Sequence, residues 1–371
     1  MGITEGMMNR MVASNLRRRP VRSLVAIIAI AVEVALILLI VGLTNGMVRD
    51  NRTRMAGVGA DVVIRPSSSS MFFALGGNTM PLKLAALLKK QPGVTAVAPV
   101  AMQINGKSLS TVGGIELGSF DAVSGGFQFL HGRPFHRPDQ VIVDDIYARA
   151  HHLQAGQWLT LLGHRFQLSG IYEHGKGSRI YISLAELDSL VGAPEKAAVF
   201  YLKLAHPEQA QAMVDRLEKL LPGYTIQPMQ QYLSLFTSAN MPGLPLFQHS
   251  MIGIGVIIGF LVIFLSMYTT ILERTREIGI LKSLGASRPY IVQAILREGA
   301  ALAALGILAG WGLAWIIGAV LRHAYPALTI ELTWGWAGRA AAIAVAGSLI
   351  GASYPAYKAA TQDPIAALAY E

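Results

Sequence analysis

The 371-residue sequence contains no cysteine, and only 14% of its residues are charged. The missing cysteine excludes disulfide frameworks, CxxC redox motifs and zinc sites built from thiolates. The low charge excludes a disordered chain, because disordered chains are polar and rich in charge. The 38 Gly and 17 Pro follow no fixed period, which excludes a collagen-like chain. Hydrophobic residues make up 53% of the chain, so we expect part of it to lie in a membrane.

Four apolar runs are long enough to cross about 30 Å of hydrocarbon at about 1.5 Å per residue. They predict transmembrane helices over residues 23–45, 250–272, 299–321 and 334–357. The first run is longer than the apolar stretch of a signal peptide and no A-x-A site closes it, so we expect an uncleaved anchor. One span therefore precedes the long segment 46–249, and three spans follow it.

Lysine and arginine predict the orientation of these spans. Eleven of them flank the spans on one side, whereas the short loop 322–333 on the other side contains only Arg322. By the positive-inside rule, the basic N-terminus 1–22, the loop 273–298 and the C-terminus 358–371 are cytoplasmic. The segment 46–249 is then extracytoplasmic. The net charge of +9 is thus explained by topology, and we expect no nucleic-acid partner because the basic residues flank apolar runs.

The extracytoplasmic segment has the composition of a soluble domain, with 18 Lys/Arg and 14 Asp/Glu. Two stretches in it share the pattern strand, amphipathic helix, Pro-Gly, strand, and they cover residues 61–100 and 199–227. Either the pattern recurs by chance, or two β-α-β halves pair into one split α+β layer. We predict the split layer, with a β-rich subdomain inserted at about 106–196. In that subdomain we expect strands at 141–143, 158–162 and 166–172 and a helix near 147–153.

No catalytic or metal-binding residue is predicted. The stretch 170–176 is the nearest match to a P-loop, but Gly177 stands where Ser or Thr would hold magnesium, and we expect a turn there. The nine His form no HExxH motif, and no GxSxG elbow is present. We expect no cofactor in this chain and no enzymatic activity of its own.

Four neighbouring polar residues are a weaker candidate for a site. Asp144, Asp145, His151 and His152 could converge if the helix between them folds back. We expect a solvated surface instead, because these residue types are mostly exposed.

Glu33 is the one charged residue of the first predicted span. A carboxylate near the centre of a membrane is costly, so we expect it to face a partner, water or a cavity. The alternatives are a contact at a dimer seam, a substrate contact, a protonation site, or a neutral hydrogen-bonded side chain inside the helix bundle.

The sequence pattern of the loop 273–298 predicts a docking surface. Ile278, Leu281 and Leu284 recur at three-residue steps and predict an amphipathic helix that continues the second span. We expect Gly285 to end that helix, and Ser287 with Pro289 to begin another that leads into the third span. Such a helical hairpin suits docking to a cytoplasmic partner better than a solvated loop does.

These motifs resemble the MacB/FtsX-type ABC transporter permeases. The family has a run like E-R-T-x-E-I-G-I-L-x-x-L-G-A-S after its second span, and residues 273–287 match it. The end of the chain, 363–371, resembles the family's closing D-P-I-x-A-L-R-x-E, except that Ala369 replaces the arginine, and Glu33 is a second departure. The residues that we expect to contact an ATPase are Glu273, Arg274, Glu277, Ile278, Gly279, Leu281, Lys282, Leu284, Gly285, Ala286 and Ser287, with Asp363, Pro364 and Leu368 near the C-terminus.

The resemblance implies a multi-pass permease of a bacterial inner membrane, working as a homodimer or heterodimer. A separate cytoplasmic ABC ATPase would bind ATP and Mg and drive movement of the extracytoplasmic domain. Members of this family often pass their substrates to a membrane-fusion adaptor and an outer-membrane duct. We therefore expect export or extraction of a hydrophobic, lipidic or peptide substrate. The alternatives are an FtsX-like signal transducer that activates a cell-wall hydrolase, and a passive membrane-anchored scaffold.

Overall fold

Four long helices contain the four predicted spans in the computed structural model, which describes residues 20–67, 79–106, 110–192, 195–241 and 243–363. The helices are α2 (Pro20–Ala56), α9 (Leu244–Glu273), α11 (Arg288–Ala324) and α12 (Trp334–Thr361). Each is long and apolar enough to cross a membrane. They extend beyond most of the predicted ends, because polar residues that flank an apolar run can continue its helix.

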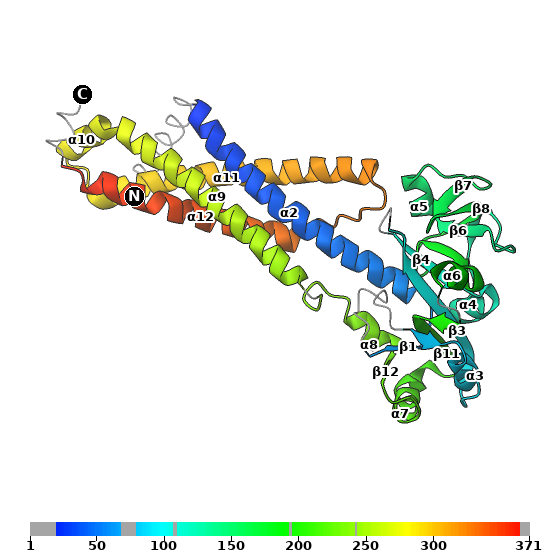
Figure 1. Cartoon of the computed structure of the whole chain (residues 1–371). Coiled ribbons are helices and arrows are strands. Elements are labelled where there is room, and N and C mark those ends of the chain that lie inside the picture. The colour runs from blue at the N-terminus through cyan, green and yellow to red at the C-terminus, as the bar shows by residue number, and fades with distance from the viewer. Residues whose placement is uncertain (1–19, 68–78, 107–109, 193–194, 242, 364–371) are drawn as a thin grey trace. The chain divides into compact units, whose positions relative to one another are not determined.

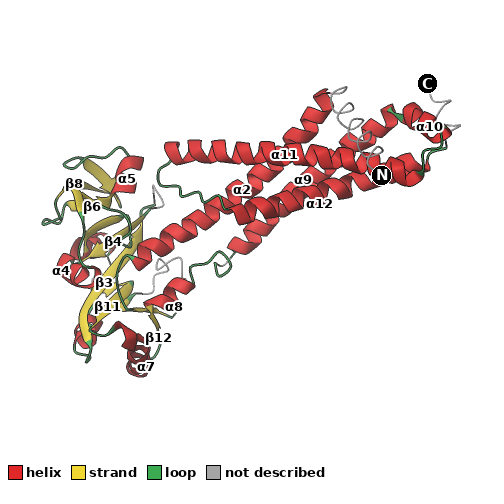
Figure 2. Ribbon diagram, turned by 180° about the vertical axis from the view of Figure 1, so that it is seen from behind, coloured by secondary structure: helices red, strands yellow, loops and turns green. Residues whose placement is uncertain are grey.

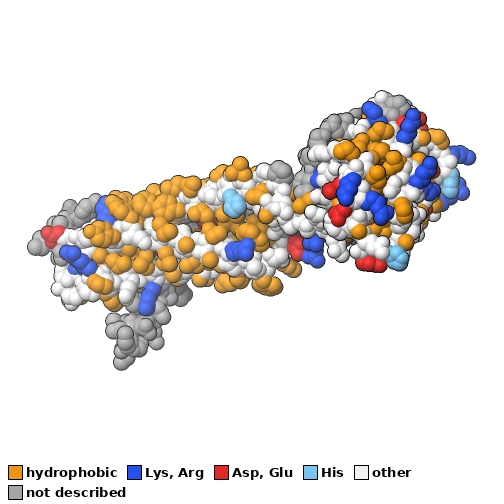
Figure 3. Space-filling view, turned by 90° about the horizontal axis from the view of Figure 1, so that it is seen from below, with side chains coloured by type: hydrophobic (Ala, Val, Ile, Leu, Met, Phe, Trp, Pro, Cys, Tyr) orange, Lys and Arg blue, Asp and Glu red, His pale blue; other side chains and the backbone are white. Residues whose placement is uncertain are grey.

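The chain divides into two units. The helical unit consists of Met1–Asn45, Gly243–His323 and Ile330–Glu371, and the α/β unit consists of Gly46–Pro242 and Ala324–Thr329. Helix α2 contributes residues to both units without a break. Figure 3 shows hydrophobic side chains covering the surface of the long helices, whereas charged side chains gather on the α/β unit.

Small residues bring the backbones of the helical unit together. A Cβ atom at Gly306 of α11 would lie 2.6 Å from the Cβ of Ile30 on α2. One at Gly310 would lie 2.8 Å from the carbonyl oxygen of Ala31. Glycines four residues apart on one helix face allow such close approach between membrane helices. In Figures 1 and 2 the four helices accordingly run alongside one another, around a shared apolar core.

The loop between α9 and α11 contains a short separate helix, α10 (Thr275–Ser283). We predicted one continuous helix from the second span, and this was wrong. The backbone leaves the helical region at Arg274, with φ −108° and ψ 12°, and a new helix begins directly afterwards. Helix α10 ends at Ser283 with Leu284 as its C-cap, and Gly285 is the left-handed residue that stops the helix, as predicted. Gly285 adopts a left-handed φ of 94°, and the N–H groups of Gly285 and Ala286 bond back to the carbonyls of Lys282 and Leu281.

The α/β unit is built on a ten-stranded sheet with the strand order β12-β1-β11-β3-β4-β9-β6-β8-β5, in which β7 also pairs with β8. A separate two-stranded sheet pairs β2 with β10. The strands are β1 (Val62–Pro66), β2 (Met80–Pro81), β3 (Val94–Ile104), β4 (Thr111–Ile115), β5 (Phe129–Gly132), β6 (Gln140–Asp144), β7 (Trp158–Leu161), β8 (His164–Tyr172), β9 (Ile180–Ser183), β10 (Lys196–Ala197), β11 (Val199–Leu204) and β12 (Tyr224–Pro228).

The two halves of the predicted repeat interleave at one end of this sheet. Strand β1 lies between β11 and β12, and β11 lies between β1 and β3, all of them antiparallel. Helices α3 (Leu84–Lys89) and α7 (Ala210–Leu220) connect the strands of the two halves, with the short 3-10 helix η1 (Pro207–Gln209) before α7. Each helix is followed by a Pro-Gly whose glycine is left-handed, Gly93 and Gly223. The layer is therefore split, as expected.

The inserted segment extends the same sheet and does not form a separate layer, which corrects the expected subdomain boundary. Strand β4 pairs with β3 from Thr111 to Ile115, so the hydrogen bonds continue across the junction. The insert does have its own apolar core, separate from the core under the split layer. It contains α5 (Asp145–Ala150) near the predicted helix, and two helices that we did not predict, α4 (Leu117–Ser124) and α6 (Leu184–Val191). A last short helix, α8 (Met229–Ser234), follows β12.

Candidate functional site

The predicted docking residues lie on α10 and on the turn after it. Ile278 points inward and packs with Ile271, Ile291, Ala359 and Ala360, which come from α9, α11 and α12. Leu281 is half-buried, and Leu284 is 80% exposed. The three residues therefore do not form the single exposed ridge that we expected. Ile278 anchors α10 to the bundle, and Leu284 remains available to a partner.

Polar contacts also hold this segment against the bundle. The Lys282 ammonium donates to the carbonyl oxygen of Ala360 at 3.0 Å and to that of Gln362, near the last carbonyls of α12. A cation there is favourable because the C-terminal end of a helix carries partial negative charge. Arg274 pairs with Glu277 at 3.3 Å and with Glu298 of α11 at 3.4 Å. Helix α10 is thus connected to α11 and α12 as well as to α9.

The remaining predicted residues of this segment divide by exposure. Glu273, Glu277, Gly285 and Ser287 are exposed, Ala286 is half-buried, and Gly279 is buried. The carbonyl of Ser287 accepts from the N–H groups of Tyr290 and Ile291 in the first turn of α11. Near the C-terminus, Asp363 is described, whereas Pro364 and Leu368 lie outside the described residues.

Glu33 lies in the interior of the helical unit, and only 5% of its surface is exposed. It faces α9 at two glycines. A Cβ atom at Gly255 would lie 3.7 Å from the Glu33 Cγ, and a Cβ atom at Gly259 would overlap the carboxylate itself. Two glycines four residues apart therefore make the space that the carboxylate fills. Sequence reasoning singled out Glu33 but missed this pair, whose spacing in an apolar run was the available signal.

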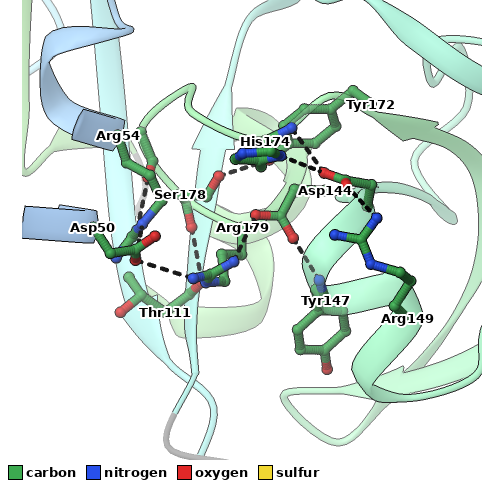
Figure 4. Close-up of polar contacts among 12 residues, drawn as sticks. Asp50, Arg54, Thr111, Asp144, Tyr147, Arg149, Tyr172, His174, Ser178 and Arg179 are labelled. Carbon is green, nitrogen blue, oxygen red and sulfur yellow. Dashed lines mark hydrogen bonds and ion pairs between the residues drawn. The ribbon is translucent and has the colours of Figure 1, made fainter. Parts of the chain in front are cut away.

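A second group of charged residues surrounds the end of α2 within the α/β unit (Figure 4). The Arg179 guanidinium pairs with Asp50 of α2 at 3.0 Å and with Asp144 of β6 at 3.0 Å. Asp50 also pairs with Arg54, one turn further along α2, at 2.9 Å. Asp144 is almost fully buried. Burial raises the pKa of Asp144 above its usual value, against the opposing charge of Arg179.

Backbone contacts reinforce this ion-pair cluster. Arg54 donates from Nη1 to the Gly177 carbonyl at 2.8 Å, and the Gly177 N–H donates to the Arg54 carbonyl at 2.8 Å. A Cβ atom at Gly57 would overlap the Gly175 carbonyl. The loop after β8 therefore binds the last turns of α2 through hydrogen bonds and close packing. We call Asp50, Arg54, Asp144, Gly177 and Arg179 the α2 clasp.

Sequence reasoning missed the clasp, and its expectation for Asp144 and Asp145 was wrong. Both side chains are buried and paired, not solvated. Asp144 caps α5 by accepting from the Tyr147 N–H at 2.6 Å, and Asp145 pairs with Arg149 at 2.7 Å. The i,i+4 spacing of Asp50 and Arg54 could have suggested that α2 continues past the membrane. No local signal connects either residue to Arg179.

The other candidates offer no catalytic arrangement. His151 and His152 are exposed on the turn after α5. Residues 170–172 belong to β8, and a loop, not a helix, follows them. Over the described part of the chain, no cluster of three or more His, Asp or Glu could hold a metal ion.

Two family models match the chain. The MacB-like periplasmic core domain matches residues 23–220, and the FtsX-like permease C-terminal region matches residues 250–364. Together they include the predicted docking segment, Glu33 and the α2 clasp.

Individual relatives match a smaller part. The uncharacterized ABC transporter permease YknZ of Bacillus subtilis is 37% identical over 122 residues, which are 33% of this chain and 30% of YknZ. The pyoverdine export ATP-binding/permease protein PvdT of Pseudomonas fluorescens is 37% identical over 122 residues, which are 33% of this chain and 18% of PvdT. The match therefore spans less than a third of the length of these curated relatives. The crystal structure of the periplasmic region of MacB from Actinobacillus actinomycetemcomitans covers 48% of this chain and 92% of that region, at 14% identity and a TM-score of 0.38.

Proposed function

Because the chain belongs to the MacB/FtsX-type ABC transporter permeases, we propose that it couples ATP hydrolysis by a separate cytoplasmic ATPase to movement of its α/β unit. In this proposal the ATPase docks on the segment 273–298. ATP and Mg bind to the ATPase, and this chain supplies no catalytic group. The α/β unit and the short loop 322–333 lie outside the cytoplasm, and both termini lie inside.

The observation that carries the proposal is the construction of α10. Ile278, Lys282 and Arg274 connect this helix to α9, α11 and α12 at once, whereas Leu284 beside it is 80% exposed. A surface that is attached to three spans and exposes an apolar side chain can bind a partner and transmit the partner's displacement to the spans. A solvated connecting loop would need none of these contacts.

The proposal includes a second permease copy, because closure of an ABC ATPase dimer needs two docking surfaces. It also includes export or extraction of a hydrophobic, lipidic or peptide substrate, with an adaptor and an outer-membrane duct where the cell has an outer membrane. The family match supports these steps, and each is tested by adding the component to the reconstituted permease and ATPase.

Replacement of Leu284 by Asp tests the docking step. We expect Leu284→Asp to remain in the membrane and to reduce stimulation of the ATPase at least tenfold, because a charge replaces the apolar side chain at the interface. ATP hydrolysis is measured with the ABC ATPase that co-purifies with the tagged full-length chain. Leu220→Asp is the matched control, since Leu220 is an exposed leucine of the α/β unit. Normal stimulation by Leu284→Asp would contradict docking at this segment.

The absence of cysteine makes the orientation directly testable. Single Ser189→Cys and Ser287→Cys substitutions place a thiol at exposed positions of the α/β unit and of the α10–α11 turn. A thiol reagent that cannot cross membranes should label Ser189→Cys in intact spheroplasts and Ser287→Cys only after lysis. The reverse pattern would contradict the proposed topology.

A further inference from the structure

A pocket of about 910 Å³ lies in the inserted part of the α/β unit, and its lining residue Asp145 directly follows Asp144 of the α2 clasp. Strand β5, helix α5, the turn after α5 and strand β8 surround it. One group of its lining residues is apolar: Leu130, Ala148, Leu153, Ala155 and Ile171. The other group is polar: His131, Asp145, Arg149, His152 and Gln154. The volume is in the range of small-molecule sites, and so is the combination of an apolar lining with a few polar groups.

The polar side of the pocket combines one carboxylate, Asp145, with side chains that carry hydrogen-bond donors, Arg149 among them. The Asp145 carboxylate is largely buried and accepts from the backbone N–H and the Nδ1 of His174, both at 2.9 Å, and from Arg149 at 2.7 Å. Burial alone would raise the pKa of Asp145, but the His174 hydrogen bonds and the Arg149 charge outweigh it and lower the pKa. The Asp145 carboxylate is therefore ionised, and its hydrogen-bond acceptors are filled by His174 and Arg149. The Arg149 side chain is 60% exposed.

The backbone at His152 supplies an independent observation. The N–H groups of His152 and Leu153 bond back to the carbonyls of Arg149 and Ala148, which closes α5 with a Schellman motif. His152 has the left-handed φ of 52° that this motif requires and that glycine adopts without strain. Helices α4 and α6 of the same unit end on Gly125 and Gly192 in that conformation. At the end of α5 the chain instead has a strained residue whose side chain lines the pocket.

The apolar side of the pocket begins at the edge of the sheet. Leu130 of the terminal strand β5 is 52% exposed, whereas Ile171 of the neighbouring strand β8 is buried. An exposed leucine beside an arginine and two histidines matches a ligand that is apolar at one end and anionic at the other. The Arg149 guanidinium has five N–H donors, so it can pair with Asp145 and still donate to a carboxylate of the ligand.

We propose that this pocket binds an amphipathic carboxylate, an apolar chain that ends in a single carboxyl group. The carboxylate accepts from Arg149 and His152, and the chain lies against Leu130, Leu153 and Ile171. This binding needs neither the ATPase nor transport, so its failure would leave the proposed function untouched.

Decanoate binding to the full-length protein in lipid nanodiscs tests the proposal, with empty nanodiscs subtracted in a calorimetric titration. We expect saturable binding of one decanoate per chain. Decanol lacks the charge and acetate lacks the chain, so both should bind at least tenfold more weakly. Equal binding of decanol and decanoate would overturn the proposal.

Two variants locate the site. Arg149→Gln and His152→Gly should each weaken decanoate binding at least tenfold. His152→Gly relieves the backbone strain, so it should not lower the melting temperature, and lost binding cannot be attributed to unfolding. Glu195→Gly is the matched control, because Glu195 is an exposed residue with φ 55° elsewhere in the same unit, and it should bind as the wild type does. Wild-type affinity in both Arg149→Gln and His152→Gly would overturn the proposal, as would binding of an acidic amphipathic peptide in the absence of decanoate binding.

Discussion

At the scale of single residues, the structure explains how a carboxylate fits inside the helical unit. Glu33 occupies the space left by Gly255 and Gly259 of α9. A carboxylate inside a membrane span is energetically costly, and the predicted span 23–45 contains no charged residue other than Glu33. The two glycines of α9 therefore leave room for the Glu33 side chain inside the helical unit.

Replacement of Gly259 by Ala tests this fit. The added methyl group would overlap the Glu33 carboxylate, so we expect a loss of about 1–3 kcal/mol of stability, seen as a lower melting temperature of the purified full-length chain. Gly253→Ala is the matched control, because a Cβ atom there meets nothing within 4 Å. The double variant Glu33→Ala with Gly259→Ala should recover much of the loss. Equal melting of Gly259→Ala and Gly253→Ala would refute the contact.

The Asp145 carboxylate makes the stability of the protein depend on pH. Its pKa is lowered in the folded protein, so the ionised form contributes stability above the unfolded pKa, and this contribution disappears as the pH falls through the folded pKa. We expect Asp145→Asn to melt below wild type at pH 7, and the difference to shrink as the pH falls below 3.8, the ordinary pKa of an aspartate. Asp139→Asn, at an exposed position, serves as the control. A difference that stays constant from pH 7 to 3 would argue against this assignment.

At the scale of elements, helix α2 belongs to both units, and its last turns are held by the clasp. Arg179 is the central group, since it joins Asp50 of α2 to Asp144 of β6. Through these contacts a displacement of α2 would reach the inserted strands of the sheet. A clasp of this kind suits a helix that must move a domain, as the proposed function requires.

Removal of the central cation should open the clasp. Arg179→Met leaves the carboxylates of Asp50 and Asp144 without their shared partner, and breaking a buried ion pair costs about 3–5 kcal/mol. We expect a large drop in the melting temperature of the full-length chain. Arg165→Met is the control, since Arg165 lies on β8 over the exposed ring of Trp158. Similar melting of the two variants would mean that the clasp contributes little.

Sequence reasoning succeeded for elements whose signal is local. Apolar length placed the four spans, and the Pro-Gly stops placed the ends of α3 and α7 and so the split layer. It failed where the answer depends on distant residues. Helices α4 and α6 are short, and tertiary packing decides their formation. The pairing of β4 with β3 and the burial of Asp144 depend on partners far along the chain. Ile278 and Leu284 do not share one face of α10, because a six-residue separation at 3.6 residues per turn places them about 120° apart around the helix axis.

At the scale of the whole molecule, composition and architecture agree. The apolar excess lies in four helices around a core of small residues, and a charged, ordinary α/β unit accounts for the rest. The predicted docking segment is attached to three of the helices, and α2 continues into the α/β unit. In the proposed function, ATP-driven docking at α10 moves the α/β unit.

A distance measurement between spin labels can detect this movement, because the native chain has no thiol to interfere. Labels at His323→Cys, at the end of α11, and at Ser189→Cys, on α6, report on the two units. In the complex with its ATPase, we predict that addition of ATP and vanadate shifts this distance distribution. A control pair inside the α/β unit, Ser189→Cys with Gln211→Cys, should stay unchanged. An unchanged His323–Ser189 distribution in an ATPase-active complex would contradict the account.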